Sequence, residues 1–381
     1  MQIEDSPGRL HLVSGVSIAS AKLNILDCDG FGLMNYFEGR CREGEYQNRD
    51  CLYVGTRTGE KIILISGGGK EGDERYIKGN TYATAYITEA NECTPSFLKE
   101  AFDRTLSSKN RHIFHDLNPK DPAHWYYQDI LNFHEQQQQA NPDYGYNYGH
   151  FTIADNMSVS TEKIRQALVT YDKRSVWYHR DILGERTAAE GLVYPMFDDK
   201  ENTYDDTTRP PHLESYARRY AAIDYGTENP CVFLDIYDDN ETVWIDREYY
   251  YDGRKEGKPK TDHQYGDDFE QFFSARPLLT DIVMDPSADS FEAELTLRGY
   301  TVTPADNDVV PGLRNMATLI QLRHLKANKR CEHLLQEIRG YIWDEKARQR
   351  GDEKPLKIGD HTQDAARYFV RTILPVWRRG E

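Results

Sequence analysis

The sequence predicts an α/β protein in two domains. Short apolar runs alternate with segments of helical spacing along most of its 381 residues, the pattern of strands joined by helices. Several runs end in a carboxylate or a small-residue loop. The acidic stretch 198–212 interrupts the pattern and ends in Pro-Pro-His. We therefore expect a first domain at 1–197, a linker at 198–215 and a second domain at 216–381.

Composition and charge narrow the class of protein. A hydrophobic content of 38% supports packed cores, and no apolar run approaches the ~18 residues that span a membrane. No signal peptide precedes the first strand, and the six cysteines form no CxxC pair, so we expect a soluble, intracellular protein without membrane contact, zinc or disulfides. The formal charge of −16 argues against charge-driven duplex binding by the whole chain. Residues 301–381, however, carry 15 Lys/Arg against 11 Asp/Glu, which fits a nucleic-acid surface and a solvated helical surface equally well.

Residues 10–28 have the layout of a phosphate-binding loop, with a strand, a small-residue loop and a helix. Such loops need a Lys that reaches phosphates and a hydroxyl that holds magnesium. Lys22 and Ser20 are the candidates here. Ala21 stands where Gly is expected and Leu23 where Ser or Thr is expected. An ordinary strand–loop–helix corner is the alternative.

A later strand, 84–89, ends in Glu89 and is similar to the second ATPase motif, in which a strand ends in Asp-Glu. The Asp of that motif polarises the magnesium shell and the Glu activates water. Thr88 occupies the Asp position here, and a solvated Glu at a strand edge is the alternative. A further strand at 112–115 runs into the loop that carries Asn118.

In the second half, two apolar strands joined by a Gly-containing turn are expected at 220–224 and 231–234, the first ending in Asp224. An aromatic strand at 243–251 follows, antiparallel to its neighbour. A buried strand at 282–285 ends in Asp285. The final helix, 360–370, places His361, Asp364 and Tyr368 on one face at i, i+3 and i+7.

Asp224, Asp285 and Asp364 together suggest a metal-dependent hydrolase. Two divalent ions about 4 Å apart need several convergent carboxylates, and such a pair can clamp a phosphodiester during in-line displacement. Hard oxygen ligands favour Mg²⁺ or Mn²⁺ over Zn²⁺. His361 is either a water-orienting or proton-relaying group or a surface residue at a helix start. Asp360 is expected to be the N-cap of that helix rather than a further ligand.

The order of these pieces resembles the ribonuclease-H-like nuclease fold, and the whole chain resembles the large terminase subunit of tailed bacteriophages. In the first half the resemblance is carried by AYITEANE at 85–92, HDLNPKDPAHWYY at 115–127 and WYHRDILGERTAAEGLVYPMF at 177–197. In the second half it is carried by AIDYGT at 222–227, IVMDPSA at 282–288, LRGYTVTPADN at 297–307, RGYIWDE at 339–345 and DHTQDAARYFV at 360–370. The order of these motifs is more specific than any one of them.

The resemblance implies a P-loop-NTPase-like ATPase motor domain followed by a ribonuclease-H-like nuclease domain that cuts concatemeric viral DNA. It implies metal binding by the three carboxylates, with His361 before the last. In the motor it implies a phosphate-loop role for Lys22, catalysis by Glu89 and coupling of hydrolysis to movement at Asn118. The implied cofactors are two Mg²⁺ or Mn²⁺ ions and ATP. The implied partners are double-stranded DNA, a small terminase subunit and a portal protein in the host cytoplasm, with copies of this chain assembled on the portal.

The chain departs from the family pattern at Ala21, Leu23 and Thr88. The span between the strands at Cys51 and Glu89 is short for such a motor, as if a segment were lost, which predicts a truncated motor domain. We therefore expect ATP hydrolysis to be weak or absent and the nuclease to be intact. Two alternatives are a junction-resolving nuclease of the same fold and a degenerate prophage protein that retains only protein contacts.

Overall fold

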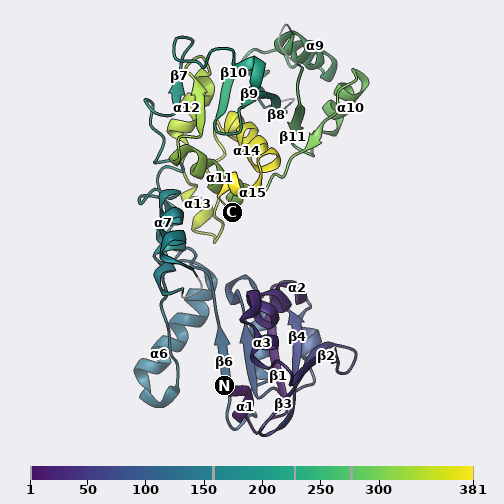
Figure 1. The fold of residues 1–381 in the computed structure, drawn as a ribbon, viewed down its shortest axis with the longest axis vertical. Helices are drawn as coiled ribbons and strands as arrows, with labels where there is room; N and C mark the ends of the chain where they lie inside the picture. The colour runs from purple at the N-terminus through teal and green to yellow at the C-terminus, as the bar shows by residue number, and fades with distance from the viewer. Residues whose placement is uncertain (1, 157–158, 227–228, 275–277, 381) are drawn as a thin grey trace. The chain divides into compact units, whose positions relative to one another are not determined.

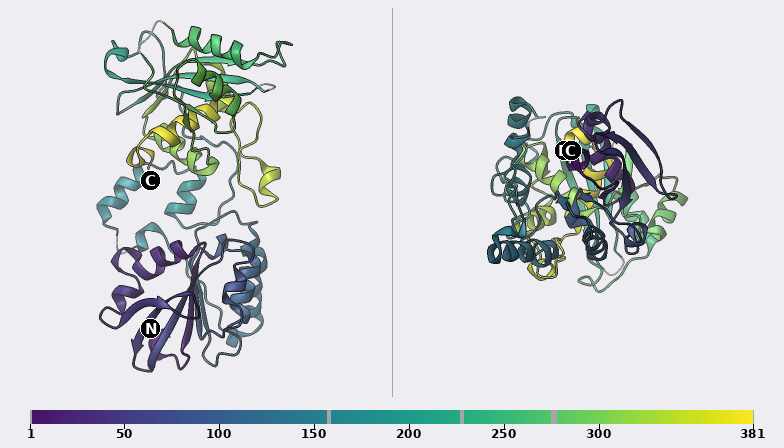
Figure 2. Two further views of the ribbon diagram at one scale, coloured as in Figure 1. Left: turned by 90° about the vertical axis from the view of Figure 1, so that its right-hand side faces the viewer. Right: turned by 90° about the horizontal axis from the view of Figure 1, so that it is seen from below.

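The computed structural model describes residues 2–156, 159–226, 229–274 and 278–380. The chain divides into two compact units, Met1–Asn118 and Pro119–Glu381, both visible in Figures 1 and 2. Among the described residues, no helix is long and apolar enough to cross a membrane.

The first unit is built on a six-stranded sheet in the order β2-β3-β4-β1-β5-β6. β1 pairs in parallel with β4 and β5, and β5 pairs in parallel with β6, whereas β2 and β3 form an antiparallel edge. The strands are β1 Leu10–Gly15, β2 Cys41–Glu45, β3 Asp50–Thr56, β4 Gly59–Gly67, β5 Thr84–Ile87 and β6 His112–His115. The strands expected at Cys51, at 84–89 and at 112–115 are therefore confirmed in type and approximate position.

Short helices complete the first unit. They are α1 Gln2–Asp5, α2 Ile18–Ala21, α3 Leu33–Tyr36, α4 Glu74–Ile77 and α5 Pro95–Asp103, with the π-helix η1 Lys22–Asp27 directly after α2. Val13 of β1 and Ile63 of β4 are buried in one apolar cluster with Leu26 of η1. The expected strand, loop and helix at 10–28 are thus present.

The second unit begins with helical segments and turns rather than with its sheet. The helical segments are η4 Tyr126–Leu131, α6 Asn132–Ala140, α7 Thr161–Val169 and η7 Tyr178–Ile182. Ser160 caps α7, accepting a hydrogen bond from the Lys163 N–H. Trp177 and Val193 are buried in the main core of this unit.

The stretch expected to be a linker, 198–215, is packed within the second unit. The buried Asn202 side chain donates to the Ile320 and Leu325 carbonyls, and β7 Thr203–Tyr204 pairs with the sheet. The polar residues of this stretch serve tight turns, as where Asp205 accepts backbone hydrogen bonds. The division between compact units, after Asn118, therefore comes earlier than the linker position that the composition suggests.

The second unit has a seven-stranded sheet in the order β12-β11-β8-β9-β10-β13-β7. Its central strands are β8 Arg218–Asp224, β9 Cys231–Asp238 and β10 Val243–Tyr251, which form an antiparallel meander as expected. β11 Asp281–Met284 lies parallel to β8, and β12 Thr303–Pro304 lies parallel to β11. β13 Leu325–Asn328 extends the other side.

Helices cover both faces of this sheet. The helices of this part of the chain are α8 Leu213–Tyr216, α9 Asp262–Phe273, α10 Asp289–Leu297, α11 Val309–Gln321, α12 Glu332–Gly340, α13 Glu345–Arg348, α14 His361–Ile373 and α15 Val376–Arg379. Side chains alternate between the faces of β8. Tyr220 and Ala222 join the core formed with α11, α12 and α14, whereas Ala221 and Ile223 join the core formed with α9 and α10. Figures 1 and 2 show α14, in yellow, lying along the sheet.

Candidate active site

The alternation of side chains along two neighbouring strands fixes the face of the sheet on which two carboxylates lie. Asp224, the last residue of β8, has the parity of Tyr220 and Ala222 and therefore lies on the α14 side of the sheet. Asp285 directly follows β11 and has the parity of Val283, which packs against Tyr368 of α14. Ile223 is in register with Met284. Since paired strands lie about 4.8 Å apart, Asp224 and Asp285 leave the sheet side by side, on the same face.

The helix α14 supplies the third carboxylate. Ala365, Phe369 and Val370 are buried against the sheet. Asp364 and Tyr368 are one turn apart on an adjacent face, and both are nearly buried. The Tyr368 hydroxyl donates to Asp285 Oδ2 at 2.8 Å and is also within electrostatic reach of Asp224 and Asp364. Tyr368 therefore contacts Asp285 directly and has Asp224 and Asp364 in its electrostatic surroundings.

Each carboxylate has its own partner. His361 Nδ1 is 2.9 Å from Asp224 Oδ2. Asp364 Oδ1 accepts from Arg367 at 2.9 Å, and Asp364 Oδ2 accepts from Lys357 Nζ at 2.7 Å.

Burial and mutual charge shift the titration of this group. Burial raises the pKa of Asp224, and the charge of Asp364 raises it further, against the opposing effect of His361. Burial opposes the protonated form of His361, but the Asp224 carboxylate outweighs it and raises the His361 pKa. Burial acts to raise the pKa of Asp285 as well. Hydrogen bonds from Ser287 and other neighbours outweigh burial, so the pKa of Asp285 is lowered. The pKa of Asp224 is therefore raised, whereas that of Asp285 is lowered.

The residues present fit hard divalent cations. The donor set is oxygen-rich, as Mg²⁺ and Mn²⁺ require, and the Lys357 ammonium already acts as a cation bound to the acids, 2.7 Å from Asp364 and 3.1 Å from Asp360. Within the described ranges, no three His, Cys, Asp or Glu side chains are close enough to ligate one ion as they stand. Each of the three carboxylates is instead held by a side chain of the protein.

Asp360 occupies the expected N-cap position of α14, but its side chain makes no hydrogen bond to the helix and is paired with Lys357 instead. Glu337 of α12 serves the helix start. Its carboxylate accepts from the Thr362 N–H at 2.8 Å, the Gln363 N–H at 3.4 Å and the Thr362 hydroxyl. Sequence reasoning missed Glu337 and Lys357, because neither lies in a periodic element aimed at the acids.

In the first unit, only one of the two candidate phosphate-loop residues, Ser20, lies at the end of the central strand β1. Gly15 ends β1 where a Cβ would lie 2.6 Å from Ser20 Oγ and 3.1 Å from the Thr88 methyl, so these two residues converge over that strand end. Ser17 is the N-cap of α2, and Ser20, the third residue of that helix, exchanges hydrogen bonds with it in a capping box. Lys22 Nζ is 2.9 Å from Asp50 and 3.6 Å from Glu43, on the antiparallel edge of the sheet.

The other candidates of the first unit surround a carboxylate that sequence reasoning missed. Asp116, just after β6, accepts from the Tyr86 and Thr88 hydroxyls and from the Glu89 N–H, at 2.6, 3.0 and 3.0 Å. Glu89 has a left-handed backbone with φ of 51°. The Asn118 carbonyl accepts from the Asn91 side chain. A second acid after the next parallel strand was the signal that could have found Asp116.

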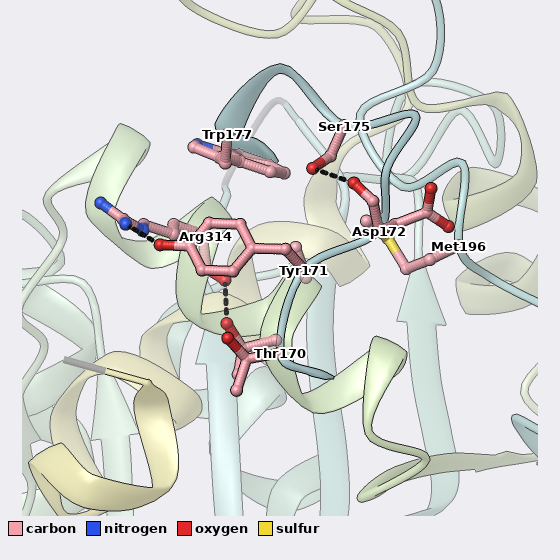
Figure 3. Close-up of a pocket in the computed structure, with 9 residues that line it drawn as sticks. Thr170, Tyr171, Asp172, Ser175, Trp177, Met196 and Arg314 are labelled. Atoms are coloured by element: carbon pink, nitrogen blue, oxygen red, sulfur yellow. Dashed lines mark hydrogen bonds between the residues drawn. The ribbon is translucent and has the colours of Figure 1, made fainter. Parts of the chain in front are cut away.

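A shallow hollow of about 10 Å³, room for about one water molecule, lies in the second unit, and none of the predicted residues lines it. Figure 3 shows Tyr171, Trp177 and Arg314 around it, with the Arg314 guanidinium donating to the Tyr171 hydroxyl. Ligand pockets usually enclose about 300–1,000 Å³. The hollow is thus a packing defect beside an ion pair between Arg314 and Asp181 rather than a substrate site.

Comparison with known proteins assigns the chain to a family. No family model and no curated protein matches it. Among solved structures, it is similar to the large terminase of a thermophilic bacteriophage, with 32% sequence identity and a TM-score of 0.78 over 96% of this chain and 86% of that one. The complexes of that phage protein with ADP and with ATP-gamma-S match with TM-scores of 0.75 and 0.74, at 31% and 32% identity and the same coverage. On this identity over nearly the full length, the chain belongs to the large terminase family.

Proposed function

We propose that this chain is a phage DNA-packaging enzyme whose second unit is an endodeoxyribonuclease dependent on two Mg²⁺ or Mn²⁺ ions. The observation that carries the proposal is that Asp224 and Asp285 end adjacent parallel strands on the side of the sheet where α14 carries Asp364, with Tyr368 of α14 bonded to Asp285. The strand order β10-β9-β8-β11-β12, an antiparallel meander followed by two parallel strands, supports a ribonuclease-H-like fold.

The chemistry divides between the ions and the side chains. Bound divalent ions would polarise a phosphodiester and lower the pKa of an attacking water. Asp224, Asp285 and Asp364 would hold them. His361 orients the Asp224 carboxylate, and the Tyr368 hydroxyl orients that of Asp285. Such partners of metal ligands typically change metal affinity or activity by about 10–100-fold when removed.

The proposal is tested by plasmid cleavage with Mn²⁺ or Mg²⁺. We expect Asp224→Asn and Asp285→Asn to lower the cleavage rate by about 100-fold or more, since several kcal/mol of transition-state stabilisation depend on the ions. Asp289→Asn is the matched control, an exposed acid one turn further along the chain. Cleavage by both site variants at the wild-type rate would refute the assignment.

We further propose that the first unit is an ATP-driven motor acting on double-stranded DNA with a small terminase subunit and a portal protein, in the host cytoplasm. The complexes of the thermophilic phage terminase with ADP and ATP-gamma-S support nucleotide binding. Ser20, Glu89 and Asn118 are the proposed nucleotide-site residues, whereas Lys22, the lysine that the resemblance places at the phosphates, is paired at the sheet edge. The ion pairs of Lys22 with Asp50 and Glu43 favour weak hydrolysis, because they direct its amine to the sheet edge.

Two competing functions give different results in the same assays. A junction-resolving nuclease would cut four-way junctions faster than linear duplex. A degenerate packaging protein would bind a small terminase subunit or a portal without binding Mn²⁺. An ATPase assay on the same preparation shows whether the first unit is active.

A further inference from the structure

The segment between α13 and α14 brings a lysine onto the acids. It is anchored at Leu356, whose N–H donates to the Ile342 carbonyl at 2.9 Å, and a β-bridge joins Pro355 to Trp343. Only residues 357–360 then separate this anchor from α14. Lys357, the first of them, reaches the acids with its four-carbon side chain.

The Lys357 ammonium sits where a divalent ion would be expected to bind Asp364. Arg367 takes one oxygen of Asp364, so Oδ2 is the oxygen left for a ligand, and Lys357 Nζ lies 2.7 Å from it. The same nitrogen is 3.1 Å from Asp360 and contributes electrostatically at Asp224. Asp360 and Asp364 are only 4% and 6% exposed, and buried carboxylates need a countercharge.

We propose that Lys357 is a tethered cation that holds this position in the ion-free protein and must leave Asp364 before a divalent ion binds there. Lys357 thereby raises the concentration of divalent ion that the site requires. This inference rests on the proposed nuclease site and adds to it a residue that sets its metal requirement.

The local structure permits this exchange. The Lys357 side chain is 55% exposed although its ammonium contacts nearly buried acids, so it can rotate into solvent. Ile358 is 74% exposed, so its side chain loses little burial in the movement. Gly359 has φ of +58°, a conformation that places the turn into α14 directly after the lysine. Displacement therefore involves residues 357–359 and leaves the Leu356 anchor intact.

The size of the effect follows from competition. An ion that binds only when Lys357 is away has its apparent affinity reduced by the fraction of time the acids are free. If the ion pair is formed about nine-tenths of the time, removing the ammonium strengthens Mn²⁺ binding about 10-fold.

The experiment is calorimetric titration of Mn²⁺ into the full chain without DNA, comparing wild type with Lys357→Gln, Lys357→Arg and Lys354→Gln. Lys354 is exposed on the same segment and makes no ion pair among the described contacts, so its variant changes net charge equally. We expect about 10-fold tighter binding in Lys357→Gln, and wild-type affinity in Lys357→Arg and Lys354→Gln. We also expect Lys357→Gln to lower the melting temperature in ion-free buffer and to regain it with Mn²⁺.

The outcomes separate the two proposals. Mn²⁺ binding of equal strength in wild type and Lys357→Gln would overturn the tethered-cation inference alone, as would weaker binding in Lys357→Gln. Equal tightening in Lys354→Gln would overturn it too, by reducing the effect to net charge. Absence of Mn²⁺ binding in wild type and all variants would overturn the proposed nuclease site itself.

Discussion

The two units place polar residues at the same kind of position, the carboxyl ends of parallel strands, yet they use them differently. In the second unit, Asp224 and Asp285 leave adjacent strands and are held by side chains of one helix. In the first unit, Asp116 after β6 is hydrogen-bonded to Tyr86 and the end of β5. Asp224 faces the ionisable His361, and its neighbour Asp364 faces Lys357 and Arg367, whereas Asp116 accepts from two hydroxyls and a backbone N–H. A strand-end carboxylate is therefore a stronger functional candidate where other charged side chains lie beside it.

The largest expected effect is that changing Asp285 and changing Asp116 have opposite consequences for DNA cleavage and for stability. Asp285→Asn should lower metal-dependent cleavage about 100-fold or more, whereas Asp116→Asn should leave cleavage within about twofold. Asp116→Asn should instead lower the free energy of unfolding of the first unit by about 2 kcal/mol, since an amide cannot accept all three hydrogen bonds. Plasmid cleavage and denaturant unfolding of the same proteins measure both. The comparison breaks if Asp116→Asn proves inactive but stable.

The acid group of the second unit was predictable because its geometry follows from periodicity. A strand ending in Asp224, a parallel strand ending before Asp285 and a helix with Asp364 require only periods of 2 and 3.6 residues. Sheet register and helix packing then bring the three together. The sequence pattern therefore indicated the element and the face of each acid, but it did not indicate the order of the strands in the sheet.

Contacts made by loops and between distant elements could not be predicted in this way. Glu337 meets the start of α14 across 25 residues, and Lys357 reaches Asp364 from a segment without periodic structure. Lys22 was assigned to phosphate by its place after a small-residue loop. Its partners Asp50 and Glu43 lie on the β2–β3 hairpin. No local sequence pattern indicates that this hairpin lies beside η1, which carries Lys22.

The second largest effect concerns acid stability of the first unit. His11 of β1 is fully buried, with Nε2 donating to the Gly8 carbonyl and Nδ1 accepting from the Thr84 hydroxyl. Burial lowers its pKa to about 4, so the unfolded chain binds a proton below pH 6.5 that the folded chain does not. Stability is therefore present above pH 6.5 and is lost as the pH falls toward 4, by about 2 kcal/mol between pH 7.5 and pH 5.

Denaturant unfolding at pH 7.5 and pH 5 measures this loss, and hydrogen exchange of β1 and β5 locates it in the first unit. His11→Gln should remove most of the difference between the two pH values. His112→Gln, on β6 of the same sheet, should keep it. A wild-type loss that His11→Gln leaves unchanged would show that other groups cause the acid sensitivity.

A smaller effect is expected where α14 begins. Glu337→Gln should lower the free energy of unfolding of the second unit by about 1 kcal/mol, because it removes a negative charge that caps the helix start. Cleavage should fall about 10-fold, since α14 carries Asp364 and Tyr368. Glu332→Gln, an exposed acid on the same helix α12, should do neither. Wild-type cleavage in Glu337→Gln would mean that the position of α14 is fixed by its core contacts alone.

The smallest effect distinguishes the two interpretations of Lys22. Its contacts with Asp50 and Glu43 are between half-exposed side chains, and such pairs contribute at most about 1 kcal/mol. Asp50, the largest cause, raises the pKa of Lys22, so its ammonium stays charged and paired near neutral pH. Lys22→Gln should therefore change unfolding by less than about 1 kcal/mol and leave any ATP turnover within about twofold. Lys61→Gln, a buried lysine whose ammonium donates to the Ser6 carbonyl, offers a contrasting variant in the same unit that should lower stability more. Magnesium-dependent ATP hydrolysis that disappears in Lys22→Gln would place this lysine at the phosphates and make the two strand-end sites alike.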